Sequence, residues 1–350
     1  MSSADFVSGF RPPDYLLDGI LQRGFLYSLT GATGGGKTAI ALLLAARAAQ
    51  NQFLAGRDCT GGRVIYFAGE NAEDVRMRWV AMAEMYGFDP STIDVHFVEG
   101  TFSLTTFADC VGLQIEELGG AALVIVDTSP AYFEGQDENS NVELGNHARM
   151  LRKLTGYRGN PCVLALCHPT KGTTSENLLP RGGGAFLAEV DGNLTARLTD
   201  MTVELHWQGK LRGPGFEPLS FELKSTTAQR LRDSRGRQIT TVVARDLTPA
   251  EADARVAASL RLQDQVLVAM NCSEKLSIAE IARKIGLIGS TGDPQKSKVH
   301  HLLGELEEAK LVTKIRKGQY ILTDKGEREA LKKAILQRSE RTDAPSSNLS

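Results

Sequence analysis

The first 170 residues alternate between short, mostly apolar runs and longer segments whose composition favours helices. Short continuous apolar runs predict strands that are buried on both faces of a sheet. A regular alternation of strand and helix predicts an α/β fold, in which a parallel sheet carries helices on both faces. The predicted strands lie at 25–30, 64–68, 94–98, 122–126 and 162–167, and the predicted helices at 38–50, 72–87, 105–118 and 142–156.

The pattern changes at about residue 192, where short segments of alternating polar and apolar residues begin. These segments predict antiparallel strands added to the parallel sheet, so we expect a first domain over residues 1–246. A linker helix is expected at 247–259, because Thr248 can cap it and Pro249 suits its first position. The predicted antiparallel strands lie at 193–200, 201–208, 218–225 and 238–246.

Residues 260–337 have the pattern of a separate domain. Three helices are followed by a hairpin that turns at Lys317 and Gly318, and then by a last helix. Three helices and a β-hairpin in this order predict a winged helix-turn-helix domain. The polar segment 338–350 predicts a disordered tail. The helices of this domain are predicted at 260–270, 278–286, 294–309 and 324–336.

A glycine-rich segment joins the first predicted strand to the first predicted helix. Residues 31–38 fit G-x-x-x-x-G-K-[ST], a loop whose backbone N–H groups surround the phosphates of a nucleotide. In this motif Lys37 reaches the β- and γ-phosphates and the Thr38 hydroxyl ligates Mg²⁺. The sequence therefore predicts a nucleotide triphosphatase that uses ATP and Mg²⁺. The expected nucleotide-binding residues are Gly31, Ala32, Thr33, Gly34, Gly35, Gly36, Lys37, Thr38 and Ala39.

Three further candidate residues lie at the ends of predicted strands, at the sheet edge where ligands bind in such folds. Asp127 is expected to hold the Mg²⁺ that Thr38 ligates. Glu70 is expected to activate the attacking water, because no glutamate directly follows Asp127; a helix-capping role is the alternative. His168 is a candidate sensor of the γ-phosphate, although a lone histidine is more often structural.

Lys210 and Arg212 lie two residues apart in a turn between two of the late strands. Side chains two residues apart on a strand point in the same direction. In a ring, the pair could enter the neighbouring subunit's site and neutralise charge on the transferred phosphate, an effect worth roughly 10³–10⁵ in rate. A solvated hairpin is the alternative, and residue type alone favours it.

Composition narrows the class of protein. The hydrophobic content of 42% and the charged content of 23% are typical of a soluble globular protein. Five scattered cysteines without metal-site spacing predict buried thiols in a reducing cytoplasm. No apolar run suits a signal peptide or approaches the roughly 18 residues of a membrane span. Residues 260–338 hold 15 Lys+Arg and 10 Asp+Glu, whereas the rest of the chain holds 25 Lys+Arg and 32 Asp+Glu. A basic domain on an acidic protein indicates that the domain binds nucleic acid.

Six segments in a fixed order carry a family resemblance: GATGGGKT, YFAGEN, LVIVD, CHPTK, RGGGAFLAEVDGNL and KLRGPG. Together they resemble the RecA-type ATPases of the RepA hexameric helicase family found on plasmids and mobile elements, over about residues 10–225. The resemblance implies a RecA-like P-loop fold and a homo-oligomer, a hexameric ring. It also implies that Glu70 is the catalytic base, His168 the γ-phosphate sensor, and Lys210 with Arg212 the cations supplied in trans.

The resemblance further implies that Arg78 lies near the adenine, and that the loops 134–141 and 170–182 face a central channel and contact single-stranded DNA. Channel loops of this kind track the nucleic-acid backbone through positive charge. Loop 134–141 is acidic in this sequence, so Lys171 and Arg181 of the second loop are the expected contacts.

The winged-helix domain carries its own candidate DNA contacts. Helix 294–309 has basic residues in its N-terminal half, the part that normally enters the major groove, and the wing has others that can hold phosphates. Protein–protein contact is the alternative, but the local positive charge favours DNA. The expected contacts are Lys296, Lys298, Lys314, Arg316 and Lys317.

These observations predict a ring-forming, ATP-dependent DNA helicase or translocase that serves replication of a plasmid, phage or integrated element. Its expected partner is single- or double-stranded DNA, with a primase or initiator as a further candidate partner. One alternative is a DNA-binding regulator or loader that ATP switches between states. Another is a RecA-type ATPase of recombination or repair.

Overall fold

The computed structural model describes residues 1–137, 140–170, 172, 177–181, 183–199, 201–271, 276–289, 292–316 and 318–342. Lys171 and Lys317, two of the expected DNA contacts, lie outside these residues, as do residues 173–176 and 182 of the loop 170–182. The chain divides into two compact units, Met1–Thr248 and Pro249–Ser350.

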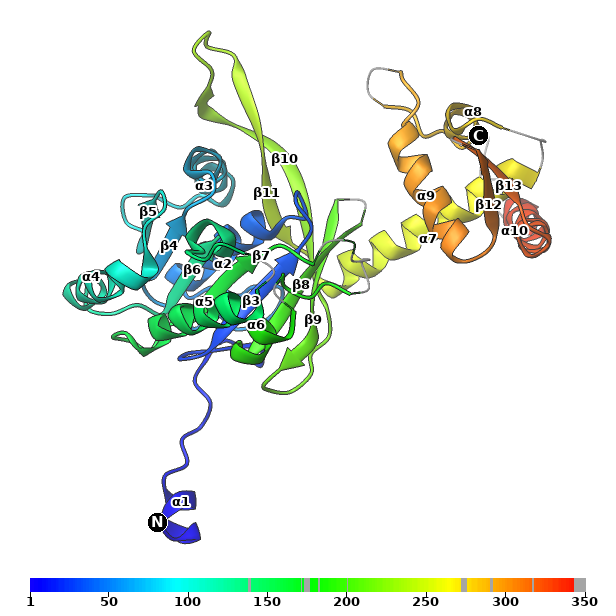
Figure 1. The fold of residues 1–350 in the computed structure, drawn as a ribbon. Helices are drawn as coiled ribbons and strands as arrows, with labels where there is room; N and C mark the ends of the chain where they lie inside the picture. Colours follow the sequence, from blue (N-terminus) through cyan, green and yellow to red (C-terminus); the bar gives the residue numbers. More distant parts are fainter. Residues whose placement is uncertain are drawn as a thin grey trace, which may run out of the picture. The chain divides into compact units, whose positions relative to one another are not determined.

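A mixed sheet forms the centre of the first unit (Figure 1). Its strand order is β11-β10-β9-β8-β3-β7-β6-β4-β5. The strands from β8 to β5 in this order run parallel, and β9, β10 and β11 are added antiparallel. The prediction of a mostly parallel sheet with an antiparallel extension is confirmed. The strands are β3 (Leu26–Gly31), β4 (Val64–Ala68), β5 (Val95–Glu99), β6 (Leu123–Asp127), β7 (Cys162–Cys167), β8 (Gly192–Thr199), β9 (Thr202–Leu211), β10 (Leu219–Arg232) and β11 (Gln238–Asp246).

Successive residues of the central strands enter two separate hydrophobic cores. In β4, Val64 and Tyr66 belong to one core, while Ile65 and Phe67 belong to the other. The continuous apolar runs in the sequence follow from this arrangement, because every position of such a strand is buried. Helices α2 and α3 supply the first core, and α4, α5 and α6 supply the second. The helices are α2 (Lys37–Gln50), α3 (Ala72–Tyr86), α4 (Leu104–Glu117), α5 (Asn141–Lys153) and α6 (Gly183–Glu189).

Several short elements were not expected from the sequence. Helix α1 forms in the lead-in because Ser2 and Asp5 make a reciprocal capping box at its N-terminus. Of the cysteines expected to be buried, Cys110 is exposed on α4, and Cys272 lies outside the described residues. The unexpected elements are α1 (Ser3–Ser8), β1 (Tyr15–Leu17), β2 (Leu21–Gln22), the 3₁₀ turns η1 (Ser129–Tyr132) and η2 (Leu154–Gly156), and α6.

The second unit contains four helices and a hairpin within its described residues. Its core joins Val266 and Leu267 of α7 to Val299, Leu302 and Leu303 of α9. No described helix of the chain combines the length and the apolar character needed to cross a membrane. The elements are α7 (Pro249–Asn271), α8 (Ile278–Lys284), α9 (Lys296–Glu308), β12 (Val312–Arg316), β13 (Gln319–Leu322) and α10 (Asp324–Thr342).

Two expected boundaries are wrong. The expected linker helix 247–259 and the next helix are one continuous helix, α7, because no glycine or proline after Pro249 interrupts it. A disordered tail was expected over 338–350, but α10 continues to Thr342, and residues 343–350 lie outside the described residues. Residues 338–342 contain no helix breaker, so the helix can extend through them.

Candidate nucleotide-binding site

The carboxyl ends of four neighbouring parallel strands bring the candidate catalytic residues to one edge of the sheet. The P-loop follows β3, and His168 follows β7, which pairs with β3 through Thr30 and Cys167. Asp127 ends β6, where it pairs with Ala68 of β4, and Glu70 lies two residues beyond Ala68. The strand order therefore places four sequence segments that are far apart in the chain around one site.

The P-loop leaves almost no space for a side chain at three of its four glycines, Gly31, Gly35 and Gly36. Gly36 has φ +87°, and a Cβ there would lie 3.0 Å from side-chain atoms of Val203 and Leu223. A Cβ on Gly35 would lie 2.9 Å from the carbonyl oxygen of Ala32. Lys37 is the first residue of α2, so the N–H groups of its first turn point toward the loop. This close backbone turn at a helix N-terminus fits the phosphates of a nucleotide.

The Lys37 side chain folds back over the loop. Its Nζ donates hydrogen bonds to the carbonyl oxygens of Gly31, at 2.8 Å, and Ala32, at 3.0 Å. Burial lowers the pKa of the Lys37 ammonium, while the carboxylate of Asp127 opposes this shift. The ammonium is thus held at the loop, where the motif requires it to meet phosphate oxygens.

Asp127 is almost fully buried and is held by two hydroxyl groups. It accepts a hydrogen bond of 2.6 Å from Tyr66 Oη. Burial raises the pKa of Asp127, and hydrogen bonds from the side chains of Tyr66 and Thr38 lower it. Within the described residues, no group of three or more His, Cys, Asp or Glu side chains could hold a metal by itself. The oxygens of Thr38 and Asp127 fit Mg²⁺, which takes one or two protein oxygens together with substrate phosphates.

The role of Tyr66 gives a first prediction. Replacing Tyr66 with phenylalanine should raise the pKa of Asp127 further, because a hydrogen bond that favours the ionised carboxylate is lost. Since a protonated carboxyl does not ligate Mg²⁺, the acid limb of the ATPase pH profile should move to higher pH. The measurement is ATPase rate against Mg²⁺ concentration at a series of pH values.

The control for this variant is Tyr27→Phe. Tyr27 is also fully buried, and its Oη accepts a hydrogen bond of 3.1 Å from the backbone N of Gln22. It lies near the start of β3, at the end of the strand opposite the P-loop, so its loss should leave the acid limb in place. A Tyr66→Phe enzyme with the Mg²⁺ and pH dependence of the wild type would contradict the assigned role.

Glu70 is half-exposed beside the loop and contacts two neighbouring strand ends. Its Oε2 accepts a hydrogen bond of 3.0 Å from Thr128 Oγ1 and lies 4.0 Å from His168 Nε2. The alternative role as helix cap is excluded by the structure, because the N-cap of α3 is Asn71, whose side chain accepts from the N of Asp74. Glu70 is therefore available to contact a ligand above the P-loop.

A cavity of about 450 Å³ contains these groups. Arg78 lines its far side, where its Nε donates to Asp74 at 2.7 Å and its guanidinium also donates to the carbonyl oxygen of Val242 at 2.7 Å. The cavity joins the P-loop and the candidate catalytic residues to strands β8, β10 and β11. Its lining residues are Thr33, Gly34, Gly35, Gly36, Lys37, Thr38, Ala39, Glu70, Asn71, Asp74, Val75, Arg78, Asp127, Thr128, His168, Leu198, Met201, Leu223 and Val242.

Lys210 and Arg212 lie at the opposite end of β3 from the P-loop. In the sheet register, Gly192 pairs with both Tyr27 and Leu211, whereas the P-loop begins at Gly31. Four strand residues, or about 13 Å, separate these two levels of the sheet. The structure therefore does not bring the two cations into the nucleotide site of their own chain.

The surroundings of these two cations include a buried carboxylate that sequence reasoning did not find. Asp191 pairs with Arg212 at 2.9 Å and with Arg152 at 2.9 Å, and it accepts from the N of Leu26 at 3.0 Å. Lys210 Nζ donates to the carbonyl oxygen of Ala188. Tyr66 of β4 and Thr128, which follows β6, were also missed, because the hydroxyl group of a single buried residue gives no signal in a single sequence.

The other expected DNA contacts occupy two regions. Arg181 is partly buried, and its backbone N donates at 2.9 Å to the carbonyl oxygen of His168. In the second unit, Lys296 is exposed at the start of α9, and Lys314 and Arg316 are exposed on β12. Lys298 of α9 is partly buried.

Comparisons with known proteins give three findings. Residues 1–174 match the family model described as an AAA domain. The DNA repair and recombination protein RadB of Methanococcoides burtonii is 26% identical over 196 residues, which cover 53% of this chain and 78% of that protein. A solved structure, the KaiC-like protein of Pyrococcus horikoshii OT3, is 16% identical with a TM-score of 0.43, over 60% of this chain and 90% of that one.

Proposed function

We propose that this chain, whose residues 1–174 match the model of an AAA domain, is a P-loop ATPase of RecA type that couples ATP hydrolysis to translocation along DNA or to its unwinding. Copies of the chain form a ring in which each nucleotide site is completed by a neighbour. The observation that carries this proposal is the position of Lys210 and Arg212 in the sheet. These two cations lie level with the first residues of β3, whereas the P-loop follows the last residues of β3. Cations in that position can serve a nucleotide site only if it belongs to an adjacent copy.

The hydrolysis step assigns one task to each group. Glu70 accepts a proton from water, whose oxygen attacks the γ-phosphorus, and the bond to the β–γ bridging oxygen breaks to release ADP and phosphate. Lys37 and the backbone N–H groups of the P-loop hold the phosphate charge. Mg²⁺, where Thr38 and Asp127 hold it, would neutralise further charge on these phosphates. Lys210 and Arg212 of the neighbouring copy stabilise the charge that develops on the transferred phosphoryl group.

The contacts of His168 support a role as γ-phosphate sensor. His168 Nε2 lies 4.0 Å from Glu70 Oε2. The carbonyl oxygen of His168 accepts a hydrogen bond from the backbone N of Arg181, near the end of the loop 170–182. A shift of His168 when phosphate leaves would therefore be passed to that loop. Lys171 and Arg181 in this loop are the proposed contacts with single-stranded DNA.

The second unit is proposed to be a winged helix that binds duplex DNA. The N-terminal half of α9 would enter the major groove, and the β12–β13 hairpin would lie against the backbone. The exposure of Lys296, Lys314 and Arg316 supports these roles. RepA-like replication of a plasmid, phage or integrated element is the proposed setting.

A recombination or repair ATPase is the second candidate function. The 26% identity to a DNA repair and recombination protein favours it. The two candidates differ in assembly, because a helicase of the proposed kind closes into a ring, whereas a recombination ATPase of RecA type assembles along DNA as a filament. Electron microscopy with an ATP analogue, with and without single-stranded DNA, distinguishes a ring from a filament.

The proposed function is tested by measuring ATP hydrolysis with and without single-stranded DNA, together with strand displacement on a forked duplex. We expect DNA to stimulate turnover and the fork to be unwound only with ATP. Lys37→Ala is the control and should lose both activities, since the phosphates lose their buried cation. Turnover that is indifferent to DNA, or a fork that stays paired, would overturn the helicase assignment.

A further inference from the structure

A two-stranded ribbon, formed by β10 and β11, extends beyond the helices that cover the sheet (Figure 1). The strands pair from Phe221 and Asp246 at the base, through Thr227 and Thr240, toward a turn at 233–237. The strand at 238–246 was expected at its full length, but β10 was expected only over 218–225, because few residues of its outer half are apolar. The outer half forms because Ala228 and Leu231 are buried against the body of the unit.

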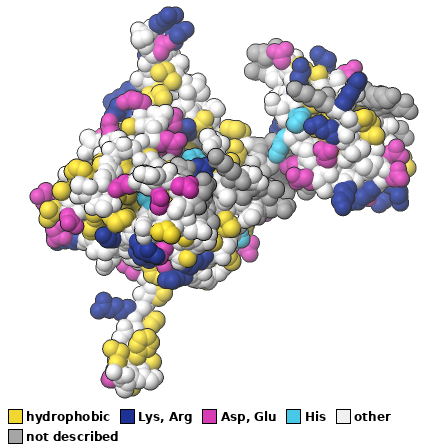
Figure 2. Space-filling model, in the orientation of Figure 1, with side chains coloured by type: hydrophobic (Ala, Val, Ile, Leu, Met, Phe, Trp, Pro, Cys, Tyr) yellow, Lys and Arg dark blue, Asp and Glu magenta, His cyan; other side chains and the backbone are white. Residues whose placement is uncertain are grey.

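The end of this ribbon is strongly basic. Figure 2 shows Lys and Arg side chains gathered at the far end of the ribbon, above a body that carries many acidic side chains. Residues 224–240 contain five Lys and Arg and one Asp, whereas the rest of residues 1–248 contain 18 Lys and Arg and 27 Asp and Glu. The exposed arginines of the tip are Arg230, Arg232, Arg235 and Arg237.

Two of the four arginines hold the turn, and the other two face solvent. Arg237 pairs with Asp233 at 2.6 Å, and Arg232 donates to the carbonyl oxygen of Gly236 at 2.8 Å. Arg230 and Arg235 are exposed, and their guanidinium groups can reach a ligand without breaking the turn. The planar guanidinium group matches the geometry of phosphate oxygens better than an ammonium does.

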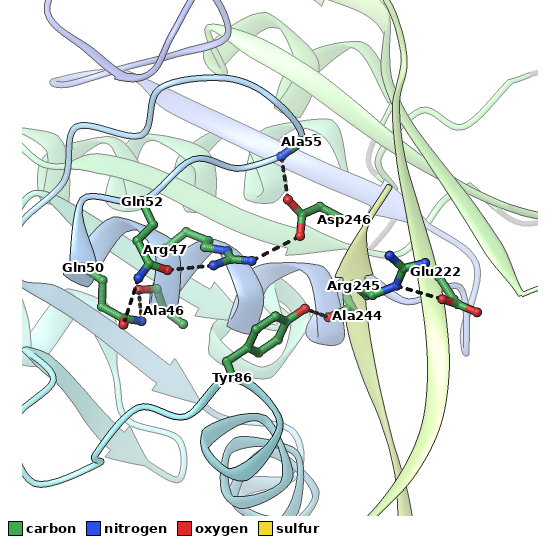
Figure 3. A network of polar contacts seen from close by, with 10 residues as sticks. All are labelled: Ala46, Arg47, Gln50, Gln52, Ala55, Tyr86, Glu222, Ala244, Arg245 and Asp246. Carbon is green, nitrogen blue, oxygen red and sulfur yellow. Dashed lines mark hydrogen bonds and ion pairs between the residues drawn. The ribbon is translucent and has the colours of Figure 1, made fainter. Parts of the chain in front are cut away.

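The base of the same ribbon is fastened to the helices around the nucleotide site (Figure 3). Asp246 pairs with Arg47 of α2 at 3.3 Å, and the carbonyl oxygen of Ala244 accepts from Tyr86 Oη of α3 at 2.9 Å. Leu223 of β10 and Val242 of β11 line the nucleotide cavity itself. The ribbon therefore connects the cavity directly to the basic tip.

We propose that the arginine tip of the β10–β11 ribbon binds the phosphate backbone of DNA, and that this contact is linked to the nucleotide site through the base of the ribbon. A two-stranded ribbon has the width that the major groove of a duplex admits. Because the rest of the unit is acidic, the tip is the part of residues 1–248 where a polyanion is attracted most strongly. The inference rests on the proposed DNA-dependent ATPase function and adds a contact site to it.

The experiment compares the full-length chain with the variant Arg230→Gln/Arg235→Gln, which keeps the two arginines that hold the turn. The matched control is Lys153→Gln/Arg158→Gln, because these residues are also exposed and carry the same charge but lie outside the ribbon. Binding of labelled duplex and single-stranded DNA is followed by fluorescence anisotropy over a range of salt concentrations. Basal ATPase rate, DNA-stimulated ATPase rate and light scattering complete the comparison.

The ribbon variant should bind duplex DNA roughly eightfold more weakly per lost contact at about 0.1 M salt, with a salt slope reduced by about 0.9 per contact. Its basal ATPase rate should be unchanged, and its DNA stimulation should fall. The control should match the wild type. If the ribbon variant has the DNA affinity and salt slope of the wild type, this inference is overturned but the proposed function is not. The same holds if the ribbon variant loses self-association while it still binds DNA. That result would assign the tip to an acidic face of a second copy of the chain. A wild-type chain that binds no DNA would overturn the proposed function as well.

Discussion

Replacing Arg212 with alanine should lower ATP turnover by roughly 10³–10⁵-fold while nucleotide binding is retained. The cation is proposed to act only on the charge that develops in the transition state, so its loss should appear in the turnover rate and not in the affinity for ATP. The P-loop of the same chain is unaffected, because Arg212 lies at the opposite end of β3. Turnover and the binding of a fluorescent ATP analogue are measured on the same preparation.

Arg149→Ala is the matched control. Arg149 is also an exposed arginine paired with a carboxylate of the segment 189–191, namely Glu189 at 3.0 Å. The fold should survive the loss of Arg212, since Asp191 keeps its ion pair with Arg152 and its bond from Leu26. The control should therefore retain wild-type turnover.

Mixing two inactive variants tests whether the site is shared. Arg212→Ala keeps its P-loop, and Lys37→Ala keeps its Arg212, so a mixed assembly contains interfaces that combine an intact P-loop with an intact arginine. Turnover should reappear on mixing, although neither variant is active alone. If mixed assemblies form and stay inactive, or if Arg212→Ala turns over normally, the claim of a cation supplied in trans fails.

Replacing Glu70 with glutamine should lower turnover by roughly 10²–10⁴-fold. The amide keeps the size of the side chain and can still accept the hydrogen bond from Thr128, but it cannot take a proton from water. ATP should still bind, and the variant should accumulate in its ATP-bound state. The measurement is phosphate release in a single turnover, with nucleotide affinity determined separately.

Glu73→Gln serves as the control for charge removal near the site. Glu73 lies in the first turn of α3 and is exposed, where it pairs with Arg76. Its loss should affect neither the rate nor ATP binding by a measurable amount, as expected for an exposed ion pair. Equal rates for the wild type and Glu70→Gln would assign the water-activating role to another group.

The amino-acid sequence by itself determined the features that depend on neighbouring residues. The P-loop could be predicted because its glycines and Lys37 act within one short turn, and the structure shows Gly31, Gly35 and Gly36 packed so closely against backbone and side chains that a Cβ would not fit without a shift. The parallel strands could be predicted because burial on both faces requires an apolar residue at every position. The termini of helices α2 to α5 were predictable to within a few residues for the same local reason, whereas the ends of α7 and α10 were not.

Only the tertiary structure decided which distant residues meet. Tyr66 and Asp127 are 61 positions apart and form a hydrogen bond because β4 and β6 are neighbours in the sheet. Asp191 meets Leu26, 165 positions away, for the same kind of reason. The pattern of apolar residues along a strand indicates that the strand is buried, but it does not identify the strand that pairs with it. Strand order and register are set by the packing of the whole sheet. The choice of Asn71 over Glu70 as helix cap, and the outer half of the β10–β11 ribbon, were likewise decided by backbone geometry and long-range packing.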